Sequence, residues 1–228
     1  MKNVGGGENG ISTKVLRDVF YVVGNRIIDI INTSLAKGVF PENWKHSTII
    51  PVPKVANTNR HTEFRPINTV PVYEKLLELV VKQQLQDYCD KNNILVSRQS
   101  GFRENHSCET VIVNICDDFL KAVDTNNFVV AVFLDFKRAF ETIDRSLLLK
   151  KLEKFGIGGT VLSWFGSYLH NRKQKVKFKG TVSDFTDTKY GVPQGTVLGP
   201  LLFLIYINDM AAVVDDCKIG VCGDDSMV

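Results

Sequence analysis

Pairs of adjacent aspartates are the residues in this sequence best suited to binding a metal ion. One pair, at 117–118, falls in a helical pattern, where neighbouring side chains diverge by about 100°, and another, at 215–216, follows a short apolar run and indicates a turn. The pair Asp224-Asp225 belongs to a Gly-Asp-Asp segment with apolar residues on both sides. That pattern predicts a hairpin with carboxylates at its tip, although Asp and Gly are also common in ordinary turns.

A further carboxylate, Asp135, ends the apolar run Phe128–Leu134. The run has the length and composition of a strand that is buried on both faces, where an unpaired charge is costly. Asp135 therefore needs a cation or strong hydrogen-bond donors, unless it caps a following helix. If Asp135 and Asp224 meet at one edge of a sheet, their oxygens suit Mg²⁺. Two such ions can activate a 3′-hydroxyl and stabilise a departing pyrophosphate.

The bulk composition indicates a globular protein. Of the 228 residues, 44% are hydrophobic and 23% are charged, which is unlike a disordered chain. The net charge of +3 permits nucleic-acid binding without requiring it. The cysteines form no CxxC and the histidines no HxxxH, which argues against a zinc site and a disulfide framework. The longest apolar run, 197–207, is about half a membrane span, so no membrane partner is expected.

Hydrophobic spacing and turn residues predict a mixed α+β chain. Helices are expected at 15–36, 72–88, after a Ser107 cap, and at 145–155, 161–170 and 200–210. In the helix 72–88, the apolar stripe is expected at Leu76, Leu79 and Val80. Strands are expected at 47–52, 128–134 and 174–179, the last leading through a Lys179-Gly180 turn to a partner near Phe185, and as short runs around Asp224.

The chain reads as one unit with two lobes, because no linker divides it. We expect an N-terminal helical extension at 1–45 and the main domain at 46–228. The sequence ends three residues after Asp225, so a hairpin at that point is expected to lack its second strand. The sequence is therefore interpreted as a fragment.

Ordered segments of this sequence resemble the reverse transcriptases of non-LTR retrotransposons, the LINE-type, jockey-like group. The catalytic blocks of that family are similar to Phe133–Asp144 (FLDFKRAFETID), Tyr190–Phe203 (YGVPQGTVLGPLLF) and Cys222–Asp225 (CGDD). The fingers blocks are similar to IIPVPK at 49–54, FRPI at 64–67 and QSGFRENHS at 99–107. The resemblance covers the chain from about Gly10, and the order of the blocks makes it more specific than any single motif.

Some residues depart from the family pattern. Glu141 stands where the family usually has Asp, and Cys222-Gly223 stands where an aromatic residue and Ala are usual. Gly-Asp-Asp is also the signature of viral RNA-dependent RNA polymerases. Phe140 argues against that class, which generally has a small polar residue at the equivalent position.

The resemblance implies an α+β fold, the fingers and palm of a right-hand polymerase, with an antiparallel palm sheet packed on helices. The thumb and an endonuclease would lie outside this sequence. The implied activity is RNA-directed DNA polymerisation, with template RNA, primer or target DNA and deoxynucleoside triphosphates as partners. The implied location is the nucleus at the site of action and the cytoplasm with the element RNA.

The resemblance also implies roles for individual residues. Asp135 and Asp224 would bind two Mg²⁺ ions, with Mn²⁺ as a second candidate, and the Phe136 backbone would be a further ligand of the metal site. Asp225 would assist at the metal site or hold the turn. Phe140 would select deoxyribose, because a bulky ring at its position clashes with a ribose 2′-hydroxyl. The triphosphate would be contacted by the backbone of Phe136, Lys137, Arg138 and Ala139, and its phosphates by the side chains of Lys54 and Arg65. The nucleotide and template would be contacted by Gln194 and Gly195. The template would also be contacted by Arg103.

Each role has a structural alternative that the sequence leaves open. Phe140 could be a core aromatic residue, 191–199 an ordinary Gly/Pro loop, and Lys54 and Arg65 solvated surface charges. Lysines at 173, 175, 177 and 179 could meet a phosphate backbone or line a solvated strand edge. For the whole chain, the alternatives are an inactive or domesticated fragment that only binds nucleic acid and an enzyme of the group II intron maturase or retron type.

Overall fold

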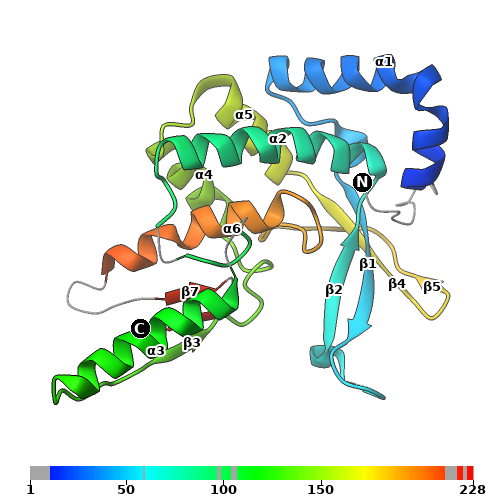
Figure 1. The fold of residues 1–228 in the computed structure, drawn as a ribbon. Helices are drawn as coiled ribbons and strands as arrows, with labels where there is room; N and C mark the ends of the chain where they lie inside the picture. Colours follow the sequence, from blue (N-terminus) through cyan, green and yellow to red (C-terminus); the bar gives the residue numbers. More distant parts are fainter. Residues whose placement is uncertain are drawn as a thin grey trace.

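A computed structural model describes residues 11–58, 60–96, 99–103, 107–213, 220–222 and 225–227. Most of the helices form one layer, and two separate sheets extend from the same side of it, with the helix 108–124 beside the smaller sheet (Figure 1). The helices are α1 (Thr13–Lys37), α2 (Val72–Lys91), α3 (Cys108–Asp124), α4 (Arg145–Lys154), α5 (Gly159–Leu169) and α6 (Gly199–Ile207), with 3-10 turns at Glu42–Trp44, His61–Glu63 and Asn208–Val213.

The larger sheet has the strand order β2-β1-β4-β5, and β6 also pairs with β4. Its strands are β1 (His46–Pro53), β2 (Phe64–Thr69), β4 (Lys173–Phe178), β5 (Thr181–Val182) and β6 (Thr186–Asp187). β1 is antiparallel to β2 and parallel to β4. Lys179 and Gly180 both have positive φ, 47° and 86°, as a two-residue hairpin turn requires. The turn was predicted, and the expected partner strand near Phe185 is β6, which pairs antiparallel with β4. A second short partner, β5, follows the turn directly.

The smaller sheet is antiparallel, with the order β3-β8-β7. It consists of β3 (Phe133–Asp135), β7 (Gly220–Cys222) and β8 (Asp225–Met227). The expectation that the hairpin lacks its second strand was wrong, because β8 supplies it and pairs with both neighbours. Three residues are enough here because β8 is the central strand and bonds on both edges.

The strand that precedes Asp135 is shorter and more exposed than predicted. Only Phe133–Asp135 is strand, and the side chains of Phe128 and Phe133 are 101% and 76% exposed. β3 lies at the end of the strand order, so within the described residues its outer edge has no partner. The prediction of a strand buried on both faces was wrong, since an apolar run does not by itself reveal which elements cover it.

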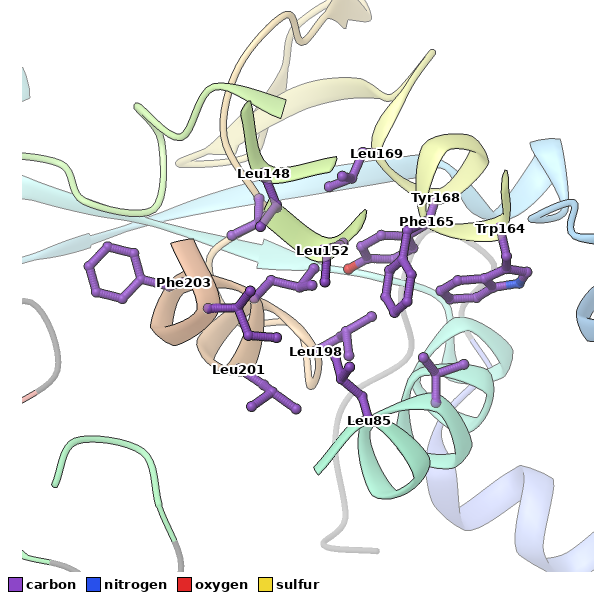
Figure 2. Close-up of a cluster of buried hydrophobic side chains, with 14 of the residues drawn as sticks. Leu85, Leu148, Leu152, Trp164, Phe165, Tyr168, Leu169, Leu198, Leu201 and Phe203 are labelled. Atoms are coloured by element: carbon purple, nitrogen blue, oxygen red, sulfur yellow. The ribbon is translucent and has the colours of Figure 1, made fainter. Parts of the chain in front are cut away.

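The core lies where α2, α4, α5 and α6 meet (Figure 2). Trp164 and Tyr168 of α5 stack with ring centroids 5.4 Å apart. Helix α6 is apolar on all sides and almost wholly buried, which is typical of a central helix. It packs on Leu148 and Leu152 of α4. The core therefore fixes the position of the start of α6, to which the loop 191–195 leads.

Helix α2 was predicted correctly as a helix, but its buried face was not. Leu79 and Val80 are 39% and 37% exposed, whereas Glu74 and Glu78 are completely buried. The helix turns its acidic side inward because those carboxylates have partners on other elements, described below. No helix among the described residues is long and apolar enough to cross a membrane.

Candidate active site

The strand that ends at Asp135 and the Gly-Asp-Asp hairpin belong to the same sheet. The antiparallel register places Asp135 opposite Asp225, and Cys222 faces Asp225 on the other side. Directly opposed residues in such a ladder have Cα atoms about 4.5–5.5 Å apart. Asp224 falls between β7 and β8 but lies outside the described residues, as does Gly223.

This arrangement fits a hard divalent cation by the chemistry of its donors. Two carboxylate residues distant in sequence meet on neighbouring strands, and carboxylate oxygens are preferred Mg²⁺ ligands. Asp135 is exposed, so its carboxylate is accessible to solvent and ions. Among the described residues, which omit Asp224, no group of three or more His, Cys, Asp or Glu could hold a metal ion.

A tight turn directly follows Asp135. Arg138 has a left-handed backbone, with φ 57°, and its carbonyl accepts hydrogen bonds from the amides of Glu141 and Thr142 at 2.9 and 3.2 Å. Ala139 is buried under this turn, while Lys137 and Arg138 are exposed. The turn therefore fixes the backbone of 136–140 beside the aspartate.

Backbone hydrogen bonds join this turn to the Gly/Pro-rich loop. The Val192 amide donates to the Phe140 carbonyl and the Gly191 amide to the Ile143 carbonyl, both at 2.8 Å. Gly191 has φ 78°, and a Cβ atom there would lie 2.7 Å from the carbonyl oxygens of Phe140 and Glu141. Only glycine permits so close an approach, so two of the sequence blocks are locked together at this residue.

Replacing Gly191 with Ala is therefore expected to lower the free energy of unfolding by about 2–4 kcal/mol, from backbone strain plus the steric collision. Chemical denaturation measures the loss. Gly180→Ala is the matched control, because Gly180 has a similar φ of 86° but nothing within 4 Å of its added Cβ. Equal losses in the two variants would show that the contact at Gly191 is unimportant.

The other end of the loop lies against the larger sheet. The Asn68 amide of β2 donates to the Gln194 carbonyl at 2.8 Å. Gly195, with φ 98°, would place a Cβ atom 3.2 Å from the Asn68 carbonyl oxygen. The Thr196 hydroxyl closes the loop by donating to the Pro193 carbonyl at 2.9 Å. Gln194 and Gly195 thus lie against Asn68 of β2, which fixes the backbone of this part of the loop.

The predicted basic residues occupy different places. Lys54 follows β1 and Arg65 lies on β2; both are exposed, and both are on the larger sheet, whereas the aspartates are on the smaller one. Arg103 stabilises its own loop, because its Nη1 donates to the carbonyls of Val96 and Gln99, both at 3.2 Å. These hydrogen bonds therefore attach the Arg103 side chain to the backbone of its own loop, at Val96 and Gln99.

Phe140 is half-buried, and its ring contacts other aromatic rings. Its centroid is 5.0 Å from that of Phe203 on α6 and 5.9 Å from that of Phe102. Ala139 and Ile143, which lie close to Phe140 in the sequence, are buried. Phe140 is thus partly a core residue, as the structural alternative held, with part of its ring exposed.

Sequence reasoning missed a network of buried charges beneath the loop. Glu78 accepts a hydrogen bond from the Tyr168 hydroxyl at 2.6 Å and another from the Val197 amide, at the start of α6, at 2.7 Å. Glu74 pairs with Arg172 at 2.5 Å. The only sequence signal for this network was the i, i+4 spacing of Glu74 and Glu78, on the side of the helix that also carries Leu77. Acidic residues at that spacing are usually solvated.

The buried Glu74 predicts a pH dependence of stability. Burial raises the pKa of Glu74 to about 8, against the opposing effect of the Arg172 guanidinium. Because the folded pKa exceeds the ordinary value of 4.5, the folded state binds the proton more tightly, and stability falls as pH rises from about 4.5 to about 8. Burial also raises the pKa of Glu78, so Glu74→Gln should reduce the fall only in part. Chemical denaturation across this range checks it; an unchanged slope in the variant would contradict the assignment.

Comparison with known proteins adds independent information. The family described as reverse transcriptase (RNA-dependent DNA polymerase) matches residues 52–228. The chain is 31% identical over 182 residues to a probable RNA-directed DNA polymerase from transposon BS of Drosophila melanogaster, and 30% identical over 182 residues to the RNA-directed DNA polymerase from mobile element jockey of the same species. Each alignment covers 79% of this chain and 20% of the relative, so the chain spans about a fifth of their length.

Among solved structures, apo telomerase from Candida tropicalis is similar, with a TM-score of 0.59 at 14% identity, over 90% of this chain and 43% of that one. At this identity the likeness concerns the fold alone. Together with the family match, it confirms the predicted class, the fingers and palm of a right-hand polymerase.

Proposed function

The chain belongs to the reverse transcriptase family, and from this premise we propose that the protein is the polymerase part of a non-LTR retrotransposon. It would extend a primer 3′-hydroxyl with deoxynucleoside triphosphates along an RNA template. The observation that carries the proposal is the register that sets Asp135 opposite Asp225. The similarity to the BS and jockey polymerases favours the retrotransposon class over the group II intron type.

In this proposal Asp135 and Asp224 hold two Mg²⁺ ions. When bound, such ions lower the pKa of the attacking hydroxyl and stabilise the charge that develops on the transferred phosphoryl group. The exposed position of Asp135 on β3 and its opposition to Asp225 support this assignment. Mn²⁺, which also prefers oxygen ligands, is a second candidate.

The other site residues would bind and orient the substrates. The turn after Asp135 presents the backbone of 136–139 to the triphosphate, and Lys54 and Arg65 supply positive charge to its phosphates. Gln194 and Gly195 border the nucleotide, and Phe140 excludes the ribose 2′-hydroxyl. The hydrogen bonds from Val192 to Phe140 and from Asn68 to Gln194 support this grouping, because they join three of these segments.

Primer extension tests the proposal. The protein expressed from its full reading frame, and this chain alone, are incubated with an RNA template, an annealed DNA primer, deoxynucleotides and Mg²⁺. We expect extension from the full reading frame that stops when EDTA removes the metal. If neither protein extends the primer with Mg²⁺ or Mn²⁺ but both bind the duplex, the alternative of a non-catalytic nucleic-acid-binding fragment is correct.

The proposed partners are template RNA, primer or target DNA and deoxynucleotides. Use of a chromosomal target would place the activity in the nucleus, with the element RNA bound in the cytoplasm. Fractionation of cells that express the tagged protein tests this location.

A further inference from the structure

Phe102 is an exposed aromatic residue in an unfavourable backbone conformation. Its side chain is 50% exposed, and its φ is 56°. A bulky residue rarely adopts this left-handed region, and such outliers persist only where the surrounding structure enforces them. The conformation therefore needs an explanation beyond local propensity.

The loop around Phe102 is built to enforce this conformation. Gln99 is buried, and its side-chain oxygen accepts a hydrogen bond from the Gly101 amide at 2.9 Å. Arg103, on the other side, donates to the carbonyls of Val96 and Gln99. Side chains before and after Phe102 thus fix the backbone that presents it.

The Phe102 ring is presented to Phe140. The two rings meet edge to face, with centroids 5.9 Å apart and an interplanar angle of 74°. Such pairs contribute beyond their buried area. The second ring contact of Phe140, to Phe203 at 5.0 Å, is to a core residue that is only 2% exposed. Phe140 is therefore held by one contact from the core and one from the loop.

The backbone of Phe140 cannot compensate for the loss of either contact. Its carbonyl is fixed by the Val192 amide at 2.8 Å, and the adjacent Ala139 is buried. The remaining freedom of Phe140 is rotation of its side chain, which the neighbouring rings restrict. A ring that must exclude one hydroxyl group by contact has to keep its position to within about 0.5 Å.

We propose that Phe102 is a positioning residue for sugar selection, which holds the Phe140 ring in the orientation that excludes a ribose 2′-hydroxyl. This inference rests on the proposed function, because it requires a polymerase in which Phe140 lies beside the sugar. It assigns Phe102 no contact with the nucleotide. Phe102 thereby couples the loop 99–103 to the choice between deoxynucleotides and ribonucleotides.

The test uses Phe102→Ala in the protein expressed from its full reading frame, with single-nucleotide incorporation on an RNA template. We expect the ratio of kcat/KM for deoxynucleotide over ribonucleotide to fall about 2- to 12-fold, the range that the energy of one aromatic pair implies. Incorporation of a 2′,3′-dideoxynucleotide, which has no 2′-hydroxyl, should change by less than about twofold. Phe102→Tyr should retain the wild-type ratio, and Phe102→Leu, which keeps apolar bulk without a flat ring, should lose most of it. Phe128→Ala, which removes a fully exposed ring, is the matched control.

A double-mutant cycle with Phe140→Ala separates the possible failures. If Phe102 acts through Phe140, then adding Phe102→Ala to Phe140→Ala changes the ratio no further. An unchanged ratio in Phe102→Ala and Phe102→Leu, or additive effects in the double variant, overturns the positioning role while the polymerase remains. If Phe140→Ala alone leaves the ratio unchanged, the sugar-selecting site is wrong and the role of Phe102 falls with it. Absence of incorporation by the wild type overturns the proposed function itself.

Discussion

Replacing Asp135 with Asn is expected to reduce nucleotide incorporation about a thousandfold or more while leaving the fold intact. Asn keeps the size of the side chain but removes the negative charge that would hold the divalent ions. A loss of about 4 kcal/mol of transition-state stabilisation, modest for a metal-bound oxygen, corresponds to about 10³-fold in rate. Asp135 is exposed on an edge strand, so the free energy of unfolding should change by less than about 0.5 kcal/mol.

Single-turnover incorporation and thermal unfolding of the same samples measure both effects. Asp117→Asn is the matched control, because Asp117 is also exposed and its ion pair with Lys121, at 2.5 Å, lies on the surface of α3. Such surface pairs contribute about 0.3–0.5 kcal/mol, and we expect normal activity. Substantial incorporation by Asp135→Asn would remove this residue from the site.

Replacing Arg172 with Met is expected to lower the free energy of unfolding by about 3–5 kcal/mol, the usual cost of removing one partner from a buried ion pair. Arg172 is 2% exposed and donates to Glu74, which is completely buried, and to the Tyr168 carbonyl. Among the residues that the structure describes, none forms a hydrogen bond with the Glu74 Oε2 atom. Loss of the guanidinium would leave the whole carboxyl group without its main partner.

Denaturant unfolding at about pH 9, above the raised pKa of Glu74, where the carboxyl group is ionised, measures this loss. Lys121→Met breaks an exposed pair, with side chains 68% and 57% exposed, and should cost less than about 1 kcal/mol. The double variant Glu74→Leu with Arg172→Met removes both members of the pair, so much of the stability should return. A loss below about 1 kcal/mol in Arg172→Met would show that the pair does not support the fold.

The local elements were predictable because their signals are local. Ser107 caps α3, as predicted, and Asp144 caps α4; each accepts a hydrogen bond from a backbone amide in the first helical turn. Gly38 ends α1 with φ 66°. Caps and left-handed glycines depend on a few neighbouring residues, so the sequence is sufficient to locate them.

Burial was predicted less well because it depends on distant partners. The inward face of α2 carries Glu74 and Glu78, whose partners Arg172 and Tyr168 lie 98 and 90 residues away. The apolar run before Asp135 is exposed, although its composition is that of a buried strand. A hydrophobicity pattern records which surfaces can be buried but not which element arrives to cover them.

The candidate site contains features that the sequence predicted and contacts that it did not. The family resemblance grouped the blocks in sequence, but it could not show that the Val192 amide bonds to the Phe140 carbonyl or that Phe102 contacts the Phe140 ring. These contacts are the most informative part of the site, because they show which residues hold Phe140 in place. Asp224 lies outside the described residues, so its role stays a prediction.

The most direct measurement is backbone cleavage by Fe²⁺ substituted for Mg²⁺, which breaks the chain only close to the bound ion. We expect cuts near Asp135 and near Asp224 in the wild-type protein, and Asp135→Asn should abolish both sets of cuts. If the cuts near Asp224 persist in that variant, or if Mg²⁺ does not suppress them in the wild type, then the two aspartates do not share a metal site.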